Sequence, residues 1–72
     1  MLDWSQCSFV ERHPELVGGA WVFTGTRVPV KALFENLESG AGIEDFLAWF
    51  PGVERQQVMG VLVQAEQSLT AA

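Results

Sequence analysis

The sequence has few of the cysteines and metal ligands that stabilise many small domains. Cys7 is its only cysteine, so no disulfide can form within the chain, and Cys7 and His13 are its only soft metal ligands. A structural zinc site needs four ligands. We therefore expect no metal and no cofactor. A lone cysteine with no signal peptide also indicates a compartment that keeps thiols reduced, the cytoplasm.

Cations and long apolar runs are scarce as well. Four Lys and Arg stand against nine Asp and Glu, a formal charge of −5. Nonspecific binding to nucleic acid depends on cations that release counterions from phosphates, so this charge disfavours it and suits a partner with a basic surface. No apolar run is long enough to predict a membrane span. No nucleophile–base pair and no carboxylate dyad can be assembled either, which predicts that the protein is not an enzyme.

Apolar side chains, in contrast, are in excess. They make up 49% of the 72 residues, with three Trp and five Phe among them. A chain this short forms one domain and buries only about 60% of its unfolded surface, which leaves it marginally stable. This surplus exceeds what one small core hides. We therefore predict a buried interface between two copies, that is, a homodimer.

The N-terminal part of the sequence predicts a small hairpin. The first eight residues are expected to be loosely held. Strands are expected over Ser8–Arg12 and Ala20–Thr24, because His13-Pro14 and Gly18-Gly19 break the chain between them. A two-stranded hairpin is barely stable alone, so this arm, residues 8–24, must pack on the rest of the chain.

Residues 29–69 predict a core of three helices. The first begins at Pro29 and ends at Ser39-Gly40, where Gly40 can take the left-handed cap. The second runs from Ile43 to Phe50 and the third from Arg55 to Leu69. Each carries an apolar stripe at helical spacing: Val30, Leu33, Phe34 and Leu37; then Ile43, Phe46, Leu47 and Phe50; then Val58, Val61, Leu62, Ala65 and Leu69.

The fold class is therefore mainly α, a single domain over residues 1–72 with an N-terminal β-hairpin before the three helices. Only Pro51-Gly52-Val53-Glu54 separates the last two helices. That connection has the length found in helix-turn-helix units.

Residues 18–30 carry a family resemblance. They read GGAWVFTGTRVPV, which resembles the signature of domain-of-unknown-function family 433, approximately GGKPVIRGTRIPV. The similarity covers almost everything from Phe9 to Leu69. The further matching residues are Leu33, Leu37, Gly40, Leu47, Phe50, Pro51, Val53, Val58 and Leu62.

The resemblance implies a homeodomain-like or winged-helix-like domain with three helices. Members are described as VapB-like antitoxins, often encoded beside a PIN-like ribonuclease toxin. The sequence departs from the family pattern in several places: Gly42 and Glu54 replace a Ser and a Thr that would cap the second and third helices. Trp49 and Met59 stand where the family usually has charge, which favours an interface over contact with DNA.

The family motif supplies the first group of candidate residues: Gly25, Thr26, Arg27 and Pro29. We expect them to be structural, with Arg27 paired to a carboxylate in this acidic chain, since an Arg fork suits that role. The alternative for Arg27 is contact with a phosphate or with an acidic partner.

Two further groups lie on the helices. Arg55, Gln56 and Gln57 open the third helix, where a recognition helix presents side chains to DNA bases. The alternative is an ordinary solvated helix face. Trp49, Met59 and Val63 are the predicted dimer interface, the alternative being a wider core contact.

The leading hypothesis is a non-enzymatic binding module of the antitoxin type. It would hold a protein partner such as a PIN-like ribonuclease, and would bind operator DNA only weakly alone. The alternative hypothesis is a structural oligomerisation domain that binds neither toxin nor DNA.

Overall fold

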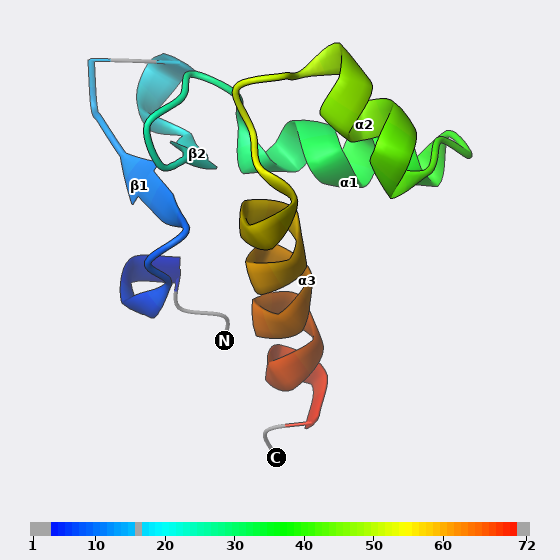
Figure 1. Ribbon diagram of the computed structural model, residues 1–72. Coiled ribbons are helices and arrows are strands. Elements are labelled where there is room, and N and C mark those ends of the chain that lie inside the picture. The colour runs from blue at the N-terminus through cyan, green and yellow to red at the C-terminus, as the bar shows by residue number, and fades with distance from the viewer. Residues whose placement is uncertain (1–3, 16, 71–72) are drawn as a thin grey trace.

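The computed structural model describes residues 4–15 and 17–70; the remainder of the predicted domain 1–72 lies outside the described residues. The described part is mainly helical. A two-stranded antiparallel hairpin precedes three helices, α1, α2 and α3 (Figure 1). The predicted fold class is therefore confirmed.

The hairpin consists of β1 (Val10–Arg12) and β2 (Trp21–Phe23). Val10 lies opposite Phe23, and Arg12 lies opposite Trp21. Both strands are shorter than predicted, because Thr24 leaves the ladder to begin a turn, where its N–H still donates to Phe9 O at 3.0 Å. At the other end, Arg12 Nε donates to Gly19 O at 2.8 Å and its guanidinium stacks 5.8 Å from the Trp21 ring centre. Arg12 thereby closes the hairpin loop.

The described part of the N-terminal stretch is more ordered than predicted. Trp4–Gln6 form a 3-10 turn, η1, and the Cys7 N–H donates to Trp4 O at 3.0 Å. Cys7 is buried, and Trp4 packs against the core. The expectation of a loosely held start is wrong for Trp4–Ser8, because these apolar side chains find cover on the helices.

The three helices follow the predicted boundaries within a residue or two. They are α1 (Val30–Glu38), α2 (Ile43–Trp49) and α3 (Arg55–Thr70). Pro29 caps α1 instead of opening it, because its extended backbone bridges Val22. Gly40 takes a φ of +101°, so the predicted left-handed end of α1 is confirmed.

The caps of α2 and α3 are made from inside each helix. Gly42 offers no side chain, yet Asp45 Oδ2 accepts a hydrogen bond from the Gly42 N–H at 2.9 Å. In α3, Gln57 Oε1 accepts from the Glu54 N–H at 2.8 Å. In each case the side chain of the third helical residue accepts a hydrogen bond from the backbone N–H of the N-cap residue, which is one of the two bonds of a capping box. This bond compensates for the missing Ser and Thr side chains.

The core lies where the hairpin meets all three helices. The Phe46 ring of α2 sits 6.0 Å from Phe23 of β2 and 4.8 Å from Phe50. The largest fully buried side chains come from β2, α1, α2 and α3: Val22, Phe23, Leu33, Phe46, Val58 and Val61. Burial of these side chains is the main stabilising term.

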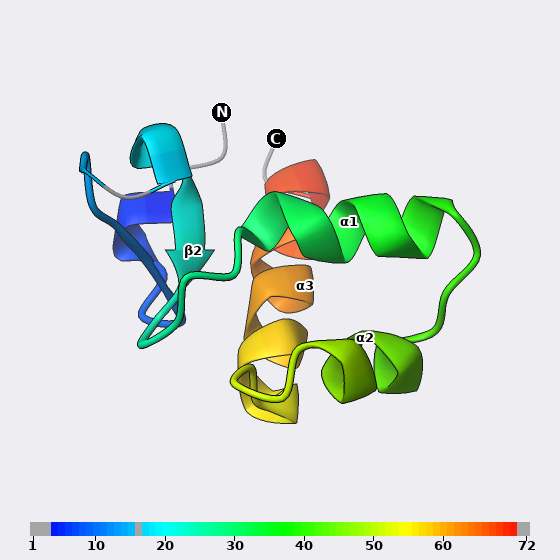
Figure 2. The ribbon, with the colours of Figure 1, turned by 90° about the horizontal axis from the view of Figure 1, so that it is seen from above.

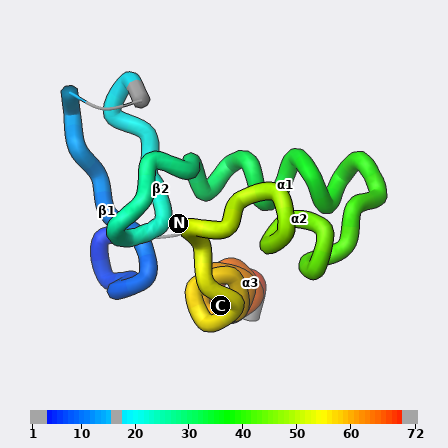
Figure 3. Tube along the Cα trace, turned by 45° about the horizontal axis from the view of Figure 1, so that its top comes forward, coloured from blue at the N-terminus to red at the C-terminus, as the bar shows by residue number. Residues whose placement is uncertain are grey.

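Helix α3 runs crosswise to α1, while α1 and α2 turn back on each other through the loop at residues 39–42 (Figure 2). Seen along α3, the hairpin lies on one side and α1 with α2 on the other (Figure 3). The second half of α3 extends past the other elements (Figure 1). Leu69, predicted on the buried stripe, is therefore 86% exposed.

One contact fixes the arm against α3. A Cβ built at Gly60, in the middle of α3, would overlap the ring of Phe9. Glycine in a helix interior costs about 1 kcal/mol relative to alanine. Here its lack of a side chain lets the Phe9 ring lie directly on the helix backbone.

Candidate functional site

The family motif forms a tightly bonded turn between β2 and α1. Gly25 takes a φ of +79°, a conformation that favours glycine. Thr26 Oγ1 donates to Phe23 O at 2.8 Å and accepts from the Val28 N–H at 3.0 Å. The Phe23 N–H in turn donates to Val28 O at 3.0 Å. These bonds leave the backbone of residues 23–28 little freedom.

Two distant elements hold the same turn from outside. Glu11 of β1 accepts from the Gly25 N–H at 2.9 Å, and Gln57 of α3 donates its Nε2–H to Thr24 O at 2.9 Å. The Gly25 bond lowers the pKa of the Glu11 carboxyl, and His13, 3.3 Å away, lowers it further. The turn is thus attached to β1, which precedes it in the chain, and to α3, the last helix.

Arg27 is the exception within this turn. Its side chain is exposed, and no carboxylate of the described residues lies within ion-pair distance. The expected pairing with a carboxylate is therefore wrong for this part of the chain, because the turn is already satisfied by Glu11, Gln57 and Thr26. Among the described cations, the other three are engaged: Arg12 on Trp21, Lys31 with Glu35, and Arg55 with Glu44.

The first turn of α3 uses two of its three candidate residues internally. Arg55 forms an ion pair with Glu44 of α2. Both ends of the Gln57 side-chain amide are hydrogen-bonded: Oε1 accepts from the Glu54 N–H, and Nε2–H donates to Thr24 O. Gln56 is exposed beside them. The three residues lie together as predicted, but Arg55 and Gln57 are occupied in holding α2 and the motif turn.

The predicted interface residues are all exposed. Trp49 is 60% exposed at the end of α2, and Met59 and Val63 are 45% and 44% exposed on α3. The alternative, that they widen the core contact, does not hold for Met59 and Val63, since Val58 and Val61 fill the core side of α3.

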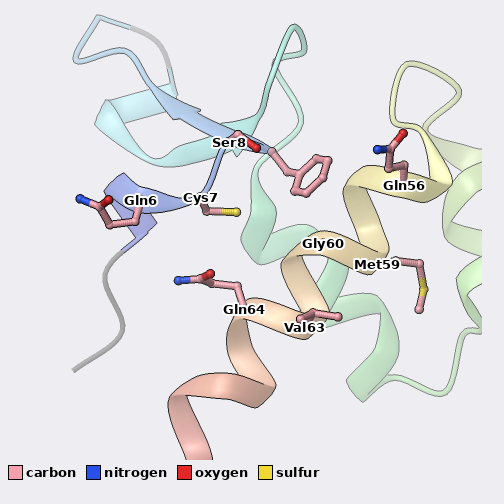
Figure 4. Close-up of a pocket in the computed structure, with 9 residues that line it drawn as sticks. Gln6, Cys7, Ser8, Gln56, Met59, Gly60, Val63 and Gln64 are labelled. Carbon is pink, nitrogen blue, oxygen red and sulfur yellow. The ribbon is translucent and has the colours of Figure 1, made fainter. Parts of the chain in front are cut away.

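Met59 and Val63 border a hollow of about 460 Å³ between the arm and α3, which we name the arm–helix groove (Figure 4). Its walls are Gln6, Cys7, Ser8 and Phe9 on one side and Gln56, Met59, Gly60, Val63 and Gln64 on the other. None of these nine residues carries a formal charge.

A second hollow, of about 420 Å³, lies against the start of α1. Trp4 of η1 and Trp21 of β2 line it together with Phe34 and Lys31 of α1. Both Trp side chains are half-buried and pack on the core, so they contribute to stability.

The chain belongs to a family of unknown function, DUF433, whose model matches residues 10–63. That match runs from β1 through the motif turn to Val63 of α3. No curated protein and no solved structure matches the chain at a significant level. None of the helices in the described residues is long and apolar enough to cross a membrane.

Sequence reasoning missed the anchors of the motif turn and the contact of Phe9 with Gly60. A glycine inside an otherwise regular helix was a usable signal, since such a glycine often marks a close approach. The bonds of Glu11 and Gln57 to the turn join residues 14 and 33 positions apart. No local pattern in the sequence predicts them.

Proposed function

We propose that the protein is a non-enzymatic binding module of the antitoxin type, which holds a protein partner such as a PIN-like ribonuclease. The observation that supports this most directly is Arg27: an exposed guanidinium, without a described partner, on a turn that β1 and α3 hold in place. A side chain on such a turn loses little backbone freedom when it binds.

The chemistry of a guanidinium limits what Arg27 would bind. Its planar fork matches carboxylates and phosphates and forms paired, charge-assisted hydrogen bonds with them. A ribonuclease with an acidic active site offers such carboxylates, and covering them would block the enzyme. Trp49, 60% exposed at the end of α2, adds apolar surface of the kind that a stable protein complex also needs.

DNA is a secondary target in this proposal. Arg55 and Gln57, the side chains suited to reading bases, are engaged within the fold. The chain also carries a charge of −5, so an isolated dimer would release few counterions from a duplex. Operator binding would therefore require a partner that adds positive charge.

The test is co-expression with the product of the adjacent reading frame, scored as cell growth and as ribonuclease activity of that product. The protein should restore growth, and Arg27→Ala should abolish the protection while its melting temperature stays that of the parent. Lys31→Ala is the matched control, since Lys31 is also an exposed cation but is paired with Glu35; it should protect normally.

Two outcomes would contradict the proposal. Equal loss of protection in both variants would mean that protection depends on the total positive charge and not on its position, so that Arg27 has no special role. An adjacent product that neither inhibits growth nor binds the chain would favour the oligomerisation domain instead.

A further inference from the structure

The exposed face of α3 repeats an uncharged pattern along most of the helix. Gln56, Met59, Val63 and Gln67 recur at intervals of three and four residues, which keeps them on one side. The only charged residues within Arg55–Thr70 are Arg55, which is paired with Glu44, and Glu66. We call these four residues the α3 face.

From this face we propose that α3 pairs with α3 of a second copy in antiparallel orientation, about a two-fold axis near Val63. The inference does not rest on the antitoxin role. It concerns the isolated chain and specifies which surfaces meet and which way they run.

Charge points to a second copy at this face. Two chains of −5 repel each other, so they approach closely only where neither presents a carboxylate. The α3 face and the nine uncharged residues of the arm–helix groove form such a surface, with Glu66, the one carboxylate of α3, at its edge. Acidic residues stand on several of the other described segments: Glu11 and Glu15 in the hairpin, Glu35 and Glu38 on α1, Glu44 and Asp45 on α2, and Glu54 just before α3. The second hollow has no carboxylate in its lining, but it presents Lys31, and a two-fold contact there would bring two like charges together.

Shape favours the antiparallel orientation. The arm flanks the first half of α3, whereas the second half extends past it (Figure 1). In an antiparallel pair, the extended half of one α3 lies beside the first half of the other and covers the partner's arm–helix groove, which Figure 4 shows for one chain. In a parallel pair, the two extended halves meet only each other and the groove stays empty.

Glu66 supports the same orientation. A parallel pair in register would bring the two Glu66 side chains to the same height. With an axis at Val63, the two Glu66 residues are six positions apart, about 9 Å along the helices at 1.5 Å per residue. That separation is about one Debye length at physiological salt, so the repulsion between them is largely screened.

Cysteine cross-linking tests the arrangement, in a Cys7→Ser background that removes the native thiol. Oxidation of Val63→Cys should give a covalent dimer as the main product, whereas Glu38→Cys, at the far end of α1, should give only background. Mixing Met59→Cys with Gln67→Cys should give the mixed disulfide, and Met59→Cys alone should not cross-link. Ready self-cross-linking of Met59→Cys without the mixed product would overturn the antiparallel orientation.

Sedimentation velocity of the protein with its native Cys7 provides the second measurement. The parent should be a dimer at micromolar concentration. Val63→Glu should weaken dimerisation on the order of a hundredfold or more, because a symmetric interface buries the new charge twice, while its helical circular dichroism is unchanged. A parent that is monomeric at 100-fold higher concentration, or a Val63→Glu variant that dimerises like the parent, would overturn the proposal.

Discussion

Replacing Gly60 with alanine sets two known effects against each other. In an exposed helix interior this change stabilises by about 1 kcal/mol, because glycine loses more backbone entropy than alanine on folding. Here the added Cβ would overlap the Phe9 ring. Overpacking of this kind costs about 1–3 kcal/mol. We therefore expect Gly60→Ala to lower the free energy of unfolding by about 1 kcal/mol.

A double-mutant cycle isolates the ring from the helix. Phe9→Ala alone should destabilise by about 2 kcal/mol, roughly half of the 3–5 kcal/mol for a fully buried Phe, since Phe9 is half-buried. In the Phe9→Ala background the obstacle is gone, so Gly60→Ala should now stabilise by about 1 kcal/mol. The sign change corresponds to a coupling of about 2 kcal/mol between the two positions.

Urea unfolding followed by circular dichroism measures all four proteins, at one protein concentration so that association contributes equally. The slope of the unfolding free energy against urea should be the same in each, which shows that the unfolded states are comparable. If Gly60→Ala stabilises the parent and the Phe9→Ala variant alike, the Phe9 ring does not lie on the helix backbone.

Three further predictions concern the motif turn. Arg27→Lys and Arg27→Ala should melt within about 0.5 kcal/mol of the parent, contrary to what the sequence suggests; a larger loss in thermal unfolding would reveal a structural partner. Gln57→Ala should lower the free energy of unfolding, measured with urea, by about 1–2 kcal/mol, because it removes the cap on Glu54 and leaves Thr24 O without its donor. Gln56→Ala should leave it almost unchanged, and an equal loss of stability in both variants would rule out the assigned bonds. The Gly25 N–H lowers the pKa of Glu11, so the stabilisation is present above the ordinary carboxyl pKa and is lost as pH falls through the lowered one. Glu11→Gln should therefore lose less stability than the parent as pH falls from neutral through this acidic range, and an unchanged acid profile would contradict this.

The fold was largely predictable because its signals are local. Apolar spacing indicated all three helices, and Gly40 and Pro51 indicated where two of them end. The stripe of α3 misled at Leu69, since spacing gives the side of a helix that is apolar but not how far the neighbouring elements reach along it. Whether Leu69 is buried depends on tertiary packing.

The site was only partly predictable. The sequence indicated that Met59 and Val63 leave the core, because a second stripe shows directly in the helical spacing. It did not indicate that Gln57 serves the motif turn, or that Arg27 lacks a described carboxylate. Glu11 and Gln57 bond to the motif turn across 14 and 33 positions of the chain, and composition alone cannot choose among many possible donors and acceptors.

The double attachment of the motif turn also bears on how the chain folds. The turn is bonded by β1, which precedes it, and by α3, which follows it across α1 and α2. Neither the hairpin nor α3 therefore has its full set of hydrogen bonds until the other is in place. Amide protons of β2 and of the first turns of α3 should then exchange with solvent through the same opening event, with the same free energy of opening. The arm and α3 would fold and unfold together, and neither the N-terminal nor the C-terminal part of the chain would be stable in isolation.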